Sequence, residues 1–350
     1  MAATATTTTT TEPLAAASLF TREGSRFPHI ASTEERVIPV RFCPTTKEQI
    51  DLCYQTYGSP ADPAVMVVCG LNSHLGMYAP EFLRQLAAKG YYVIIFDNRD
   101  AGRSTKLDHK GSPMMLLNIL PEWMLLGYNA PTYHLEDMAA DAWALLDKLD
   151  ISRAHVLGTS MGGMIVQIMA LTHPERTLSL SSLMSSTGAK DAAQAALSIK
   201  LHMLTAPKSQ EVEDLVEFRT WFATKVLLPE AHAPEDVDFF RHTARFQAQR
   251  HRYRSGVTRQ TTAIARAKCR EERLKQLTAV PALVVHGDAD RLVPYENGPR
   301  TARALPRSRF LSLPGVGHVI TPRVWERIVE HFHAMVLDPP TRSAEGLSPS

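Results

Sequence analysis

A serine set between two glycines is the residue of this sequence best placed to act as a nucleophile. The segment from Gly158 to Gly162 reads G-T-S-M-G, and it follows the short apolar run 154–157 and precedes a stretch with helical apolar periodicity. A nucleophile elbow needs this setting, because a strand must enter a tight turn and glycines two residues either side of the serine relieve crowding. No lysine follows the glycines, so a phosphate-binding loop is a poor alternative. The pattern predicts that Ser160 attacks a substrate and that the backbone N–H of Met161 binds the resulting oxyanion.

A serine hydroxyl needs a partner, because it is a weak nucleophile at neutral pH unless a nearby imidazole takes its proton. That imidazole needs an acidic group that fixes its tautomer. Downstream, V-V-H-G-D-A-D places Asp290 three residues after Gly287, beyond a predicted buried strand, and L-P-G-V-G-H places His318 just after the next strand. Ser160, Asp290 and His318 follow one another in an order that predicts a Ser-His-Asp triad.

Other acidic residues and histidines compete for these roles. Asp288 lies in the same loop as Asp290, but its place directly after a glycine favours a role in shaping the turn. His286 lies within a predicted strand and His155 at the start of another, where core or edge positions are the common case. Asp290 and His318 are therefore the favoured acid and base.

A second oxyanion donor is expected in the turn C-G-L-N-S-H that follows the predicted strand at 64–69. There the backbone N–H of Leu71 would act together with that of Met161. Because no G-G-G run is present, the sequence offers one donor at each of these two places. A plain strand-ending turn at Gly70 is the alternative.

The charged segment D-N-R-D-A-G-R-S, residues 97–104, directly follows the clearest predicted strand. Its side chains could suggest a second active site. A structural role is favoured instead, in which Asp97 and Arg99 organise a tight loop at the carboxyl ends of the strands.

Short β-rich runs alternate with helical patterns from about residue 36 onward, which is typical of a mostly parallel sheet with crossover helices. Eight strands are predicted, at 36–42, 50–57, 64–69, 91–97, 154–157, 178–183, 282–286 and 309–313. From about 190 to 276 helical patterns follow one another without a strand. The chain is therefore expected to comprise a disordered tail at 1–33, a sheet domain at 34–189 and 277–337, a helical cap at 190–276 and a loose tail at 338–350.

Composition argues against several functional classes. The 350 residues include 38 Lys and Arg against 36 Asp and Glu, and the net charge of +2 is too small to favour nucleic-acid binding. The four cysteines form no C-x-x-C pair and no metal-ligand spacing, which predicts reduced thiols, no metal and a cytoplasmic protein. No signal peptide is recognised, and the most apolar run, 114–127, is too short and interrupted to span a membrane. No cofactor is expected, and the oligomeric state is left open.

The motifs D-x-R-x-x-G-x-S, G-x-S-M-G-G, G-x-x-D and G-x-G-H, taken in order, resemble those of the α/β-hydrolase superfamily over about residues 36–335. Within it, F-D-N-R-D-A-G-R-S-T, H-L-E-D-M-A-A-D-A and H-V-L-G-T-S-M-G-G-M-I-V-Q are most similar to the esterases related to aclacinomycin methylesterase. The resemblance implies an α/β-hydrolase fold with a helical cap, and hydrolysis of a carboxylic ester, of carboxylesterase or methylesterase type, through an acyl-enzyme.

One departure is Cys69, because the superfamily often has histidine before the glycine of the oxyanion turn. The esterases just named also tend to lack that histidine. Fold and triad do not select the bond that is broken, so perhydrolase and carbon–carbon bond hydrolase activities stay open as alternatives. A ligand-binding protein with negligible turnover is a third.

Apolar residues near the expected entrance bear on the substrate. The run 114–126 has the Met and Leu content of a wall for an apolar acyl or alkyl group, so Met115 and Leu117 are predicted substrate contacts. Ordinary packing of a buried loop explains the run equally well. The helix after the elbow is expected to offer further apolar surface through its methionines, Met161, Met164 and Met169.

A local excess of positive charge lies in the predicted cap. Between residues 241 and 275 there are eleven Lys or Arg and two Glu. Solvated faces of cap helices are the favoured explanation, and attraction of an anionic substrate or a membrane surface is the alternative. The expected substrate is therefore an uncharged, largely apolar small-molecule ester.

Overall fold

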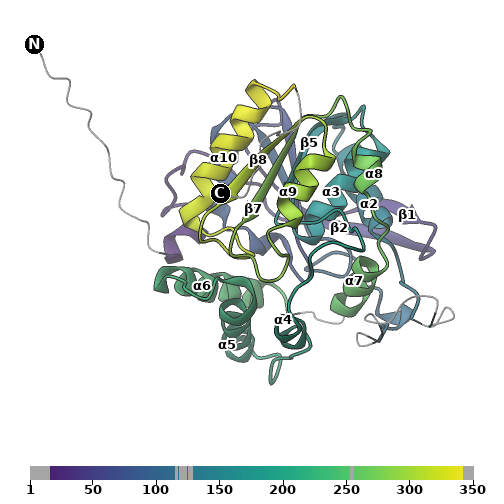
Figure 1. Cartoon of the computed structure of the whole chain (residues 1–350). Coiled ribbons are helices and arrows are strands. Elements are labelled where there is room, and N and C mark those ends of the chain that lie inside the picture. Colours follow the sequence, from purple (N-terminus) through teal and green to yellow (C-terminus); the bar gives the residue numbers. More distant parts are fainter. Residues whose placement is uncertain (1–15, 115–116, 118–123, 125–128, 253–255, 342–350) are drawn as a thin grey trace, which may run out of the picture.

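The computed structural model describes residues 16–341 except 115–116, 118–123, 125–128 and 253–255. Within them, eight strands form one sheet in the order β1-β2-β4-β3-β5-β6-β7-β8. Figure 1 shows this sheet with helices packed around it. The β1–β2 and β2–β4 pairs are antiparallel, and the remaining pairs are parallel. The strands are β1 (Arg36–Cys43), β2 (Glu48–Tyr57), β3 (Ala64–Val68), β4 (Tyr92–Phe96), β5 (Ala154–Thr159), β6 (Thr177–Leu183), β7 (Ala282–Gly287) and β8 (Ser308–Leu313). The predicted eight-stranded, mostly parallel sheet is confirmed.

Helices cover both faces of the sheet, because strands β3, β4, β5 and β7 are buried along most of their length and their apolar side chains need partners on either side. One buried cluster joins the sheet to α1 (Pro80–Ala88) and α10 (Pro322–Leu337). The cluster on the other face joins it to four helices: α2 (Leu135–Lys148), α3 (Met161–Thr172), α8 (Glu271–Leu274) and α9 (Asn297–Ala304). Short 3₁₀ turns complete the sheet domain: η1 (Ala16–Phe20), η2 (Leu75–Met77) and η3 (Asp108–Lys110).

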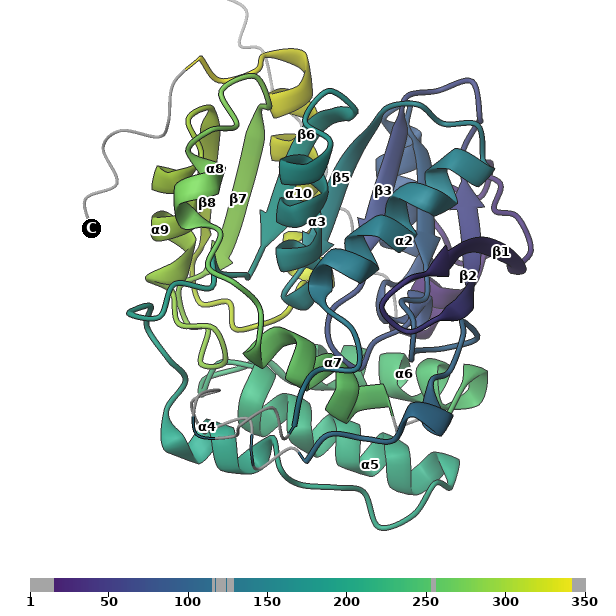
Figure 2. The same ribbon diagram turned by 90° about the vertical axis from the view of Figure 1, so that its right-hand side faces the viewer.

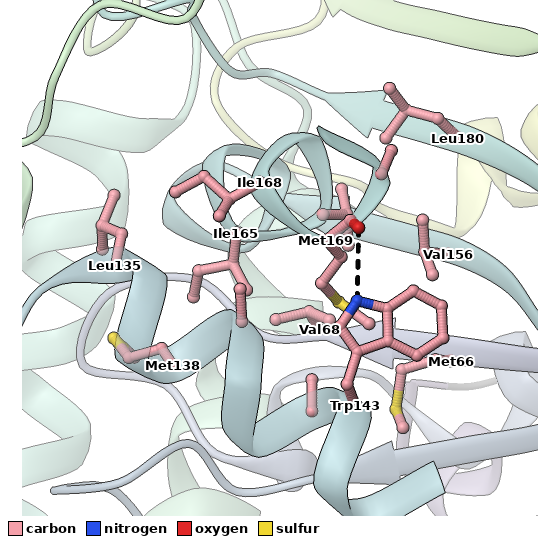
Figure 3. Close-up of a cluster of buried hydrophobic side chains, with 14 of the residues drawn as sticks. Met66, Val68, Leu135, Met138, Trp143, Val156, Ile165, Ile168, Met169 and Leu180 are labelled. Atoms are coloured by element: carbon pink, nitrogen blue, oxygen red, sulfur yellow. Dashed lines mark hydrogen bonds between the residues drawn. The ribbon is translucent and has the colours of Figure 1, made fainter. Parts of the chain in front are cut away.

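The helix after the elbow, α3, packs against both the sheet and α2, and buried side chains of all three form one cluster (Figure 3). Trp143 of α2 donates its indole N–H to the carbonyl of Met169 at 3.2 Å, and both residues are buried. The expectation that Met169 offers surface to a substrate is wrong, because this side chain is fully enclosed in the core. The expectation is also wrong for Met161, which is buried in the same cluster, whereas Met164 packs against the cluster and is partly exposed.

Between β6 and β7 the described residues contain helices and no strand. These helices are α4 (Leu197–His202), α5 (Val212–Phe222), the π-helical turn η6 (Ala223–Leu227), α6 (Pro234–Arg250), α7 (Gly256–Ala265) and α8. Figure 2 shows α4 to α7, called the helical insertion below, gathered at one end of the strands. The boundary between core and cap stays a prediction. The expected disordered tail at 1–33 is wrong for its described part, because Leu19 is buried in a core cluster and Ser25 donates to the carboxylate of Glu81. Among the described helices, none is both long enough and apolar enough to cross a bilayer.

Three arginines of the basic segment are buried, so the expectation of solvated helix faces is wrong for Arg250, Arg259 and Arg270. Each has polar partners inside the protein, which is what a buried guanidinium requires. Arg270 donates to the side chain of Gln167 and to the carbonyl of Ser186, both at 3.0 Å. Spacing along the helix does not reveal these partners, because they come from distant parts of the chain.

The loop after β4 supplies carboxylates to the other two arginines. Arg250 of α6 pairs with Asp97 at 2.7 Å and with Glu35 at 2.7 Å. Arg259 of α7 grips Asp100 with two hydrogen bonds of 2.8 Å, and neither side chain is exposed. The segment that was predicted to organise a tight loop thus also anchors two helices of the insertion to the sheet domain.

Replacing Arg259 by methionine is expected to lower the free energy of unfolding by about 3–5 kcal/mol, because the buried Asp100 carboxylate loses the guanidinium that compensates its charge. Urea unfolding of the purified variant measures this loss. Arg245→Met is the matched control, since Arg245 also makes two short bonds to a carboxylate, that of Glu213, but in an exposed position. The control should change stability little. Equal, small effects of the two substitutions would show that the buried pair does not anchor α7.

Candidate active site

Ser160 sits in the turn between β5 and α3 with a positive φ of 58°. Such a conformation is strained for a residue with a side chain and persists only where the surroundings enforce it. The surroundings of Ser160 are packed tightly. A Cβ atom on Gly158 would overlap the carbonyl of Gly162, and a Cβ atom on Gly162 would overlap the carbonyl of Val68. The elbow can therefore be this tight only with glycine at both positions.

Hydrogen bonds from the end of β6 hold the backbone of the elbow. The amide of Ser160 donates to the carbonyl of Leu183 at 2.9 Å. The carbonyl of Ser160 accepts from the hydroxyl of Ser185 at 2.8 Å and from the amide of Met164 at 3.2 Å. Ser185 was not singled out from the sequence, and a serine after a strand carries no signal that would mark it. The side chain of Ser160 is partly exposed at this fixed position.

The structure brings Asp290 and His318 into direct contact. Nδ1 of His318 lies 2.7 Å from Oδ2 of Asp290, and both residues are buried. The other carboxylate oxygen accepts the amides of Leu292 and Val293 at 2.9 and 2.8 Å. An ionised carboxylate only accepts, so Nδ1 carries a proton, and in the neutral imidazole Nε2 then has a lone pair. That lone pair is what a general base needs.

The electrostatics of this pair favour an ionised acid. Burial raises the pKa of Asp290, but the neighbouring imidazoles of His318 and His286 outweigh it and hold the pKa below the ordinary value. Asp288, the rival acid, is exposed and accepts the amide of Gly315 at 2.7 Å. The structure thus places Asp290 on the imidazole and Asp288 on the neighbouring loop.

A second histidine contacts the acid and was missed as a site residue. Nε2 of His286 lies 2.8 Å from the carbonyl of Val293 and 3.3 Å from Oδ2 of Asp290, and the residue is fully buried. Its position at the end of β7, four residues before the acid across a turn, was the available signal. His155 differs, because it bonds Ser179 at 2.8 Å and packs against the ring of Tyr91 in the core.

The turn after β3 lies beside the elbow. A Cβ atom on Gly70 would be 3.5 Å from Cβ of Ser160, which is van der Waals contact. Leu71 is the next residue along the chain and therefore begins close to the elbow. On the other side, Met161 is the first residue of α3, where a backbone N–H has no partner inside the helix. Asn98 steadies the strand end by donating to the carbonyl of Cys69 at 3.0 Å.

The predicted substrate contacts are described only in part. Met115 lies outside the described residues. Leu117 is partly buried and lines an open cleft together with Met114 and Asn129, and its carbonyl accepts from Arg266 at 3.5 Å. Its contact with a substrate stays a prediction. Among the described residues, no group of three or more metal-ligating side chains is gathered in a way that could hold a metal ion.

Comparison with known proteins shows which family the chain belongs to. The family described as alpha/beta hydrolase fold matches residues 63–321. The chain belongs to this family. It is similar to the rhodomycin D methylesterase DauP of Streptomyces sp. strain C5, with 34% identity over a region that covers 40% of this chain and 40% of that protein. The matched region therefore spans well under half of that relative.

Longer matches come at lower identity. The putative non-heme bromoperoxidase BpoC of Mycobacterium tuberculosis is 26% identical over 77% of this chain and 91% of that protein. A solved thermophilic esterase from Thermogutta terrifontis superposes with a TM-score of 0.61 at 20% identity, covering 87% of this chain and 98% of the other. At 20% identity this structural similarity is evidence for the fold and not for a shared activity.

Proposed function

We propose that this chain is a serine hydrolase that cleaves neutral carboxylic esters, of methylesterase or carboxylesterase type, through Ser160, His318 and Asp290. The observation that carries the proposal is the 2.7 Å contact between His318 Nδ1 and the Asp290 carboxylate, because it leaves Nε2 as a base. The partial match to a rhodomycin D methylesterase supports the ester as the bond that is cleaved. No cofactor or metal has a role in the proposed chemistry.

The first half of the reaction forms an acyl-enzyme. Nε2 of His318 takes the proton of the Ser160 hydroxyl as the oxygen attacks the ester carbonyl carbon. The negative oxygen of the tetrahedral intermediate accepts hydrogen bonds from the amides of Leu71 and Met161. The intermediate then collapses, the bond to the alcohol oxygen breaks, and the imidazolium returns its proton to that oxygen. Asp290 stabilises the imidazolium throughout without becoming protonated.

The second half regenerates the enzyme. A water molecule gives a proton to Nε2 of His318 while its oxygen attacks the acyl carbon, and collapse of this second intermediate returns the proton to Ser160. The net reaction converts an ester and water into a carboxylic acid and an alcohol. The apolar contacts proposed for the substrate are Met115 and Leu117.

A serine-directed phosphonate probe tests the proposal when it is combined with a panel of methyl, short-acyl and long-acyl esters. Mass spectrometry of the labelled protein should place the phosphonyl group on Ser160, and at least one ester should turn over. Labelling without turnover of any ester would favour the ligand-binding alternative. Cleavage of a carbon–carbon bond in preference to an ester would favour a carbon–carbon bond hydrolase. Preferential use of hydrogen peroxide in place of water would favour a perhydrolase.

Charge on the insertion is not expected to select the substrate. Arg250 and Arg259 are already paired with carboxylates inside the protein and have no free charge to offer. For a neutral ester, kcat/KM should change by less than about twofold between roughly 20 and 200 mM salt, because no long-range attraction is being screened. Arg252→Gln, at an exposed position, should leave this salt response unchanged.

The opposite result is equally distinct. A strong preference for carboxylate- or phosphate-bearing esters, with rates that fall steeply as salt is added, would make positive charge the selector. The proposal of a neutral, apolar substrate would then be wrong.

A further inference from the structure

The turn that carries Leu71 has a defined geometry. The amide of Ser73 donates to the carbonyl of Gly70 at 3.3 Å, which closes a four-residue turn. Asn72, at the third position, has a positive φ of 55°, while Leu71 does not. This combination is a type II turn, in which the third residue must adopt a left-handed conformation that asparagine tolerates.

A glutamine from the helical insertion reaches this turn. Gln260 of α7 is fully buried, and its Oε1 accepts the amide of Asn72 at 3.0 Å. Its Nε2 donates to the carbonyl of Arg99 at 3.0 Å, in the loop that follows β4. The preceding residue, Arg259, grips Asp100 in that same loop. Both the oxygen and the nitrogen of the Gln260 side-chain amide therefore form hydrogen bonds, and these two bonds fix its orientation.

The hydrogen bond to Asn72 controls the turn type. Type I and type II turns differ by a flip of the central peptide, which here joins Leu71 to Asn72. The Asn72 N–H belongs to that peptide, so its bond to Gln260 holds the type II orientation. The Leu71 N–H belongs to the preceding planar peptide, whose carbonyl, that of Gly70, accepts the closing bond. Both turn types can keep this closing bond, so what Gln260 holds is the peptide that directly follows Leu71, next to the peptide that carries the Leu71 N–H.

We infer that Gln260 is a positioning residue that holds the oxyanion turn, so that the helical insertion completes the catalytic machinery and does more than cover it. The inference rests on the proposed function, in which the Leu71 amide binds the oxyanion. It implies that removing the Gln260 amide weakens stabilisation of the transition state more than binding of the substrate.

The test variant is Gln260→Met, which keeps a side chain of similar size and removes both hydrogen bonds. We expect kcat for the best ester to fall about 10- to 100-fold with KM nearly unchanged, which is less than the roughly 10²- to 10³-fold cost of losing an oxyanion donor outright. The corresponding thionoester should lose much less, because its transition state places charge on sulfur, a weaker acceptor of N–H bonds. Hydrogen exchange of the Asn72 amide should accelerate.

Gln167→Met is the matched control. Gln167 is also a fully buried glutamine with two side-chain hydrogen bonds, to Ser182 at 3.1 Å and Arg270 at 3.0 Å, and in the described structure its side chain forms no hydrogen bond with the turn at 70–73. It should lower stability while leaving the ratio of oxoester to thionoester rates as in the wild type. A change of that ratio confined to Gln260→Met supports the inference.

Two results would overturn the inference. One is a folded Gln260→Met protein with the oxoester kcat of the wild type, and the other is an equal loss on the two kinds of ester. Failure of the proposed function is a separate result, because it appears as absence of ester turnover in the wild type. In that case the hydrogen-exchange rate of the Asn72 amide tests the inference. An unchanged rate in Gln260→Met would show that Gln260 does not hold the turn.

Discussion

Ser160→Ala and His318→Ala should each lose on the order of 10⁴-fold or more of ester turnover while staying folded. In the proposed mechanism, removing the hydroxyl removes the atom that forms the acyl-enzyme, and removing the imidazole leaves the hydroxyl with its proton at neutral pH. The backbone bonds that hold the elbow, from Ser160 to Leu183 and from Ser185 to Ser160, do not involve the Ser160 side chain. The elbow therefore has no reason to collapse in the alanine variant.

The measurement is kcat/KM on the best ester of the panel, together with the urea midpoint of each variant. His173→Ala is a control for His318, because His173 is a partly exposed histidine that contacts only the carboxylate of Glu175 among charged partners in the described structure. It should retain wild-type turnover. Activity within about tenfold of the wild type in folded Ser160→Ala or His318→Ala protein would remove these residues from the mechanism.

Asp290→Asn should depress turnover by roughly 10³- to 10⁴-fold, because the amide favours the wrong imidazole tautomer. The carboxylate of Asp290 accepts a hydrogen bond from the protonated Nδ1 of His318. An asparagine N–H pointing at Nδ1 would instead favour a proton on Nε2, which could then no longer act as the base. The loss should appear in kcat at saturating ester and leave the fold intact.

The matched substitution is Asp288→Asn, two residues away in the same loop. Asp288 only accepts the amide of Gly315, and the oxygen of an asparagine side chain can accept the same bond. Its turnover should therefore stay close to that of the wild type. If Asp288→Asn were the more damaging of the two, the assignment of the acid to Asp290 would be wrong.

Local pattern was enough to predict the sheet and the candidate triad. Each predicted strand lies within two residues of the observed one, because buried parallel strands are short, continuous apolar runs bounded by turn residues. The elbow at Ser160 and the G-x-x-D spacing before Asp290 are also local, so the sequence shows them directly. Nothing beyond a few neighbouring residues is needed to recognise either.

What could not be predicted depends on partners that are distant in the sequence. Arg250 and Arg259 look like solvated residues in a helical pattern, and only the folded chain shows the carboxylates that bury them. Gln260 has the same problem, because its partners in the turn after β3 belong to the other end of the chain. Met169 resembled a pocket residue since methionine suits both pockets and cores.

The contacts that join the insertion to the loops of the sheet also determine when the site can form during synthesis. Asp97 and Arg250 are 153 residues apart, Asp100 and Arg259 are 159 apart, and Asn72 and Gln260 are 188 apart. Strands β1 to β6 leave the ribosome before any of these partners exist, and contacts of such long range form slowly. A chain halted before α7 would therefore carry Ser160 and the turn at 70–73 without the bond from Asn72 to Gln260, and the proposed site, which also needs Asp290 and His318, would be complete only after most of the polypeptide has been made.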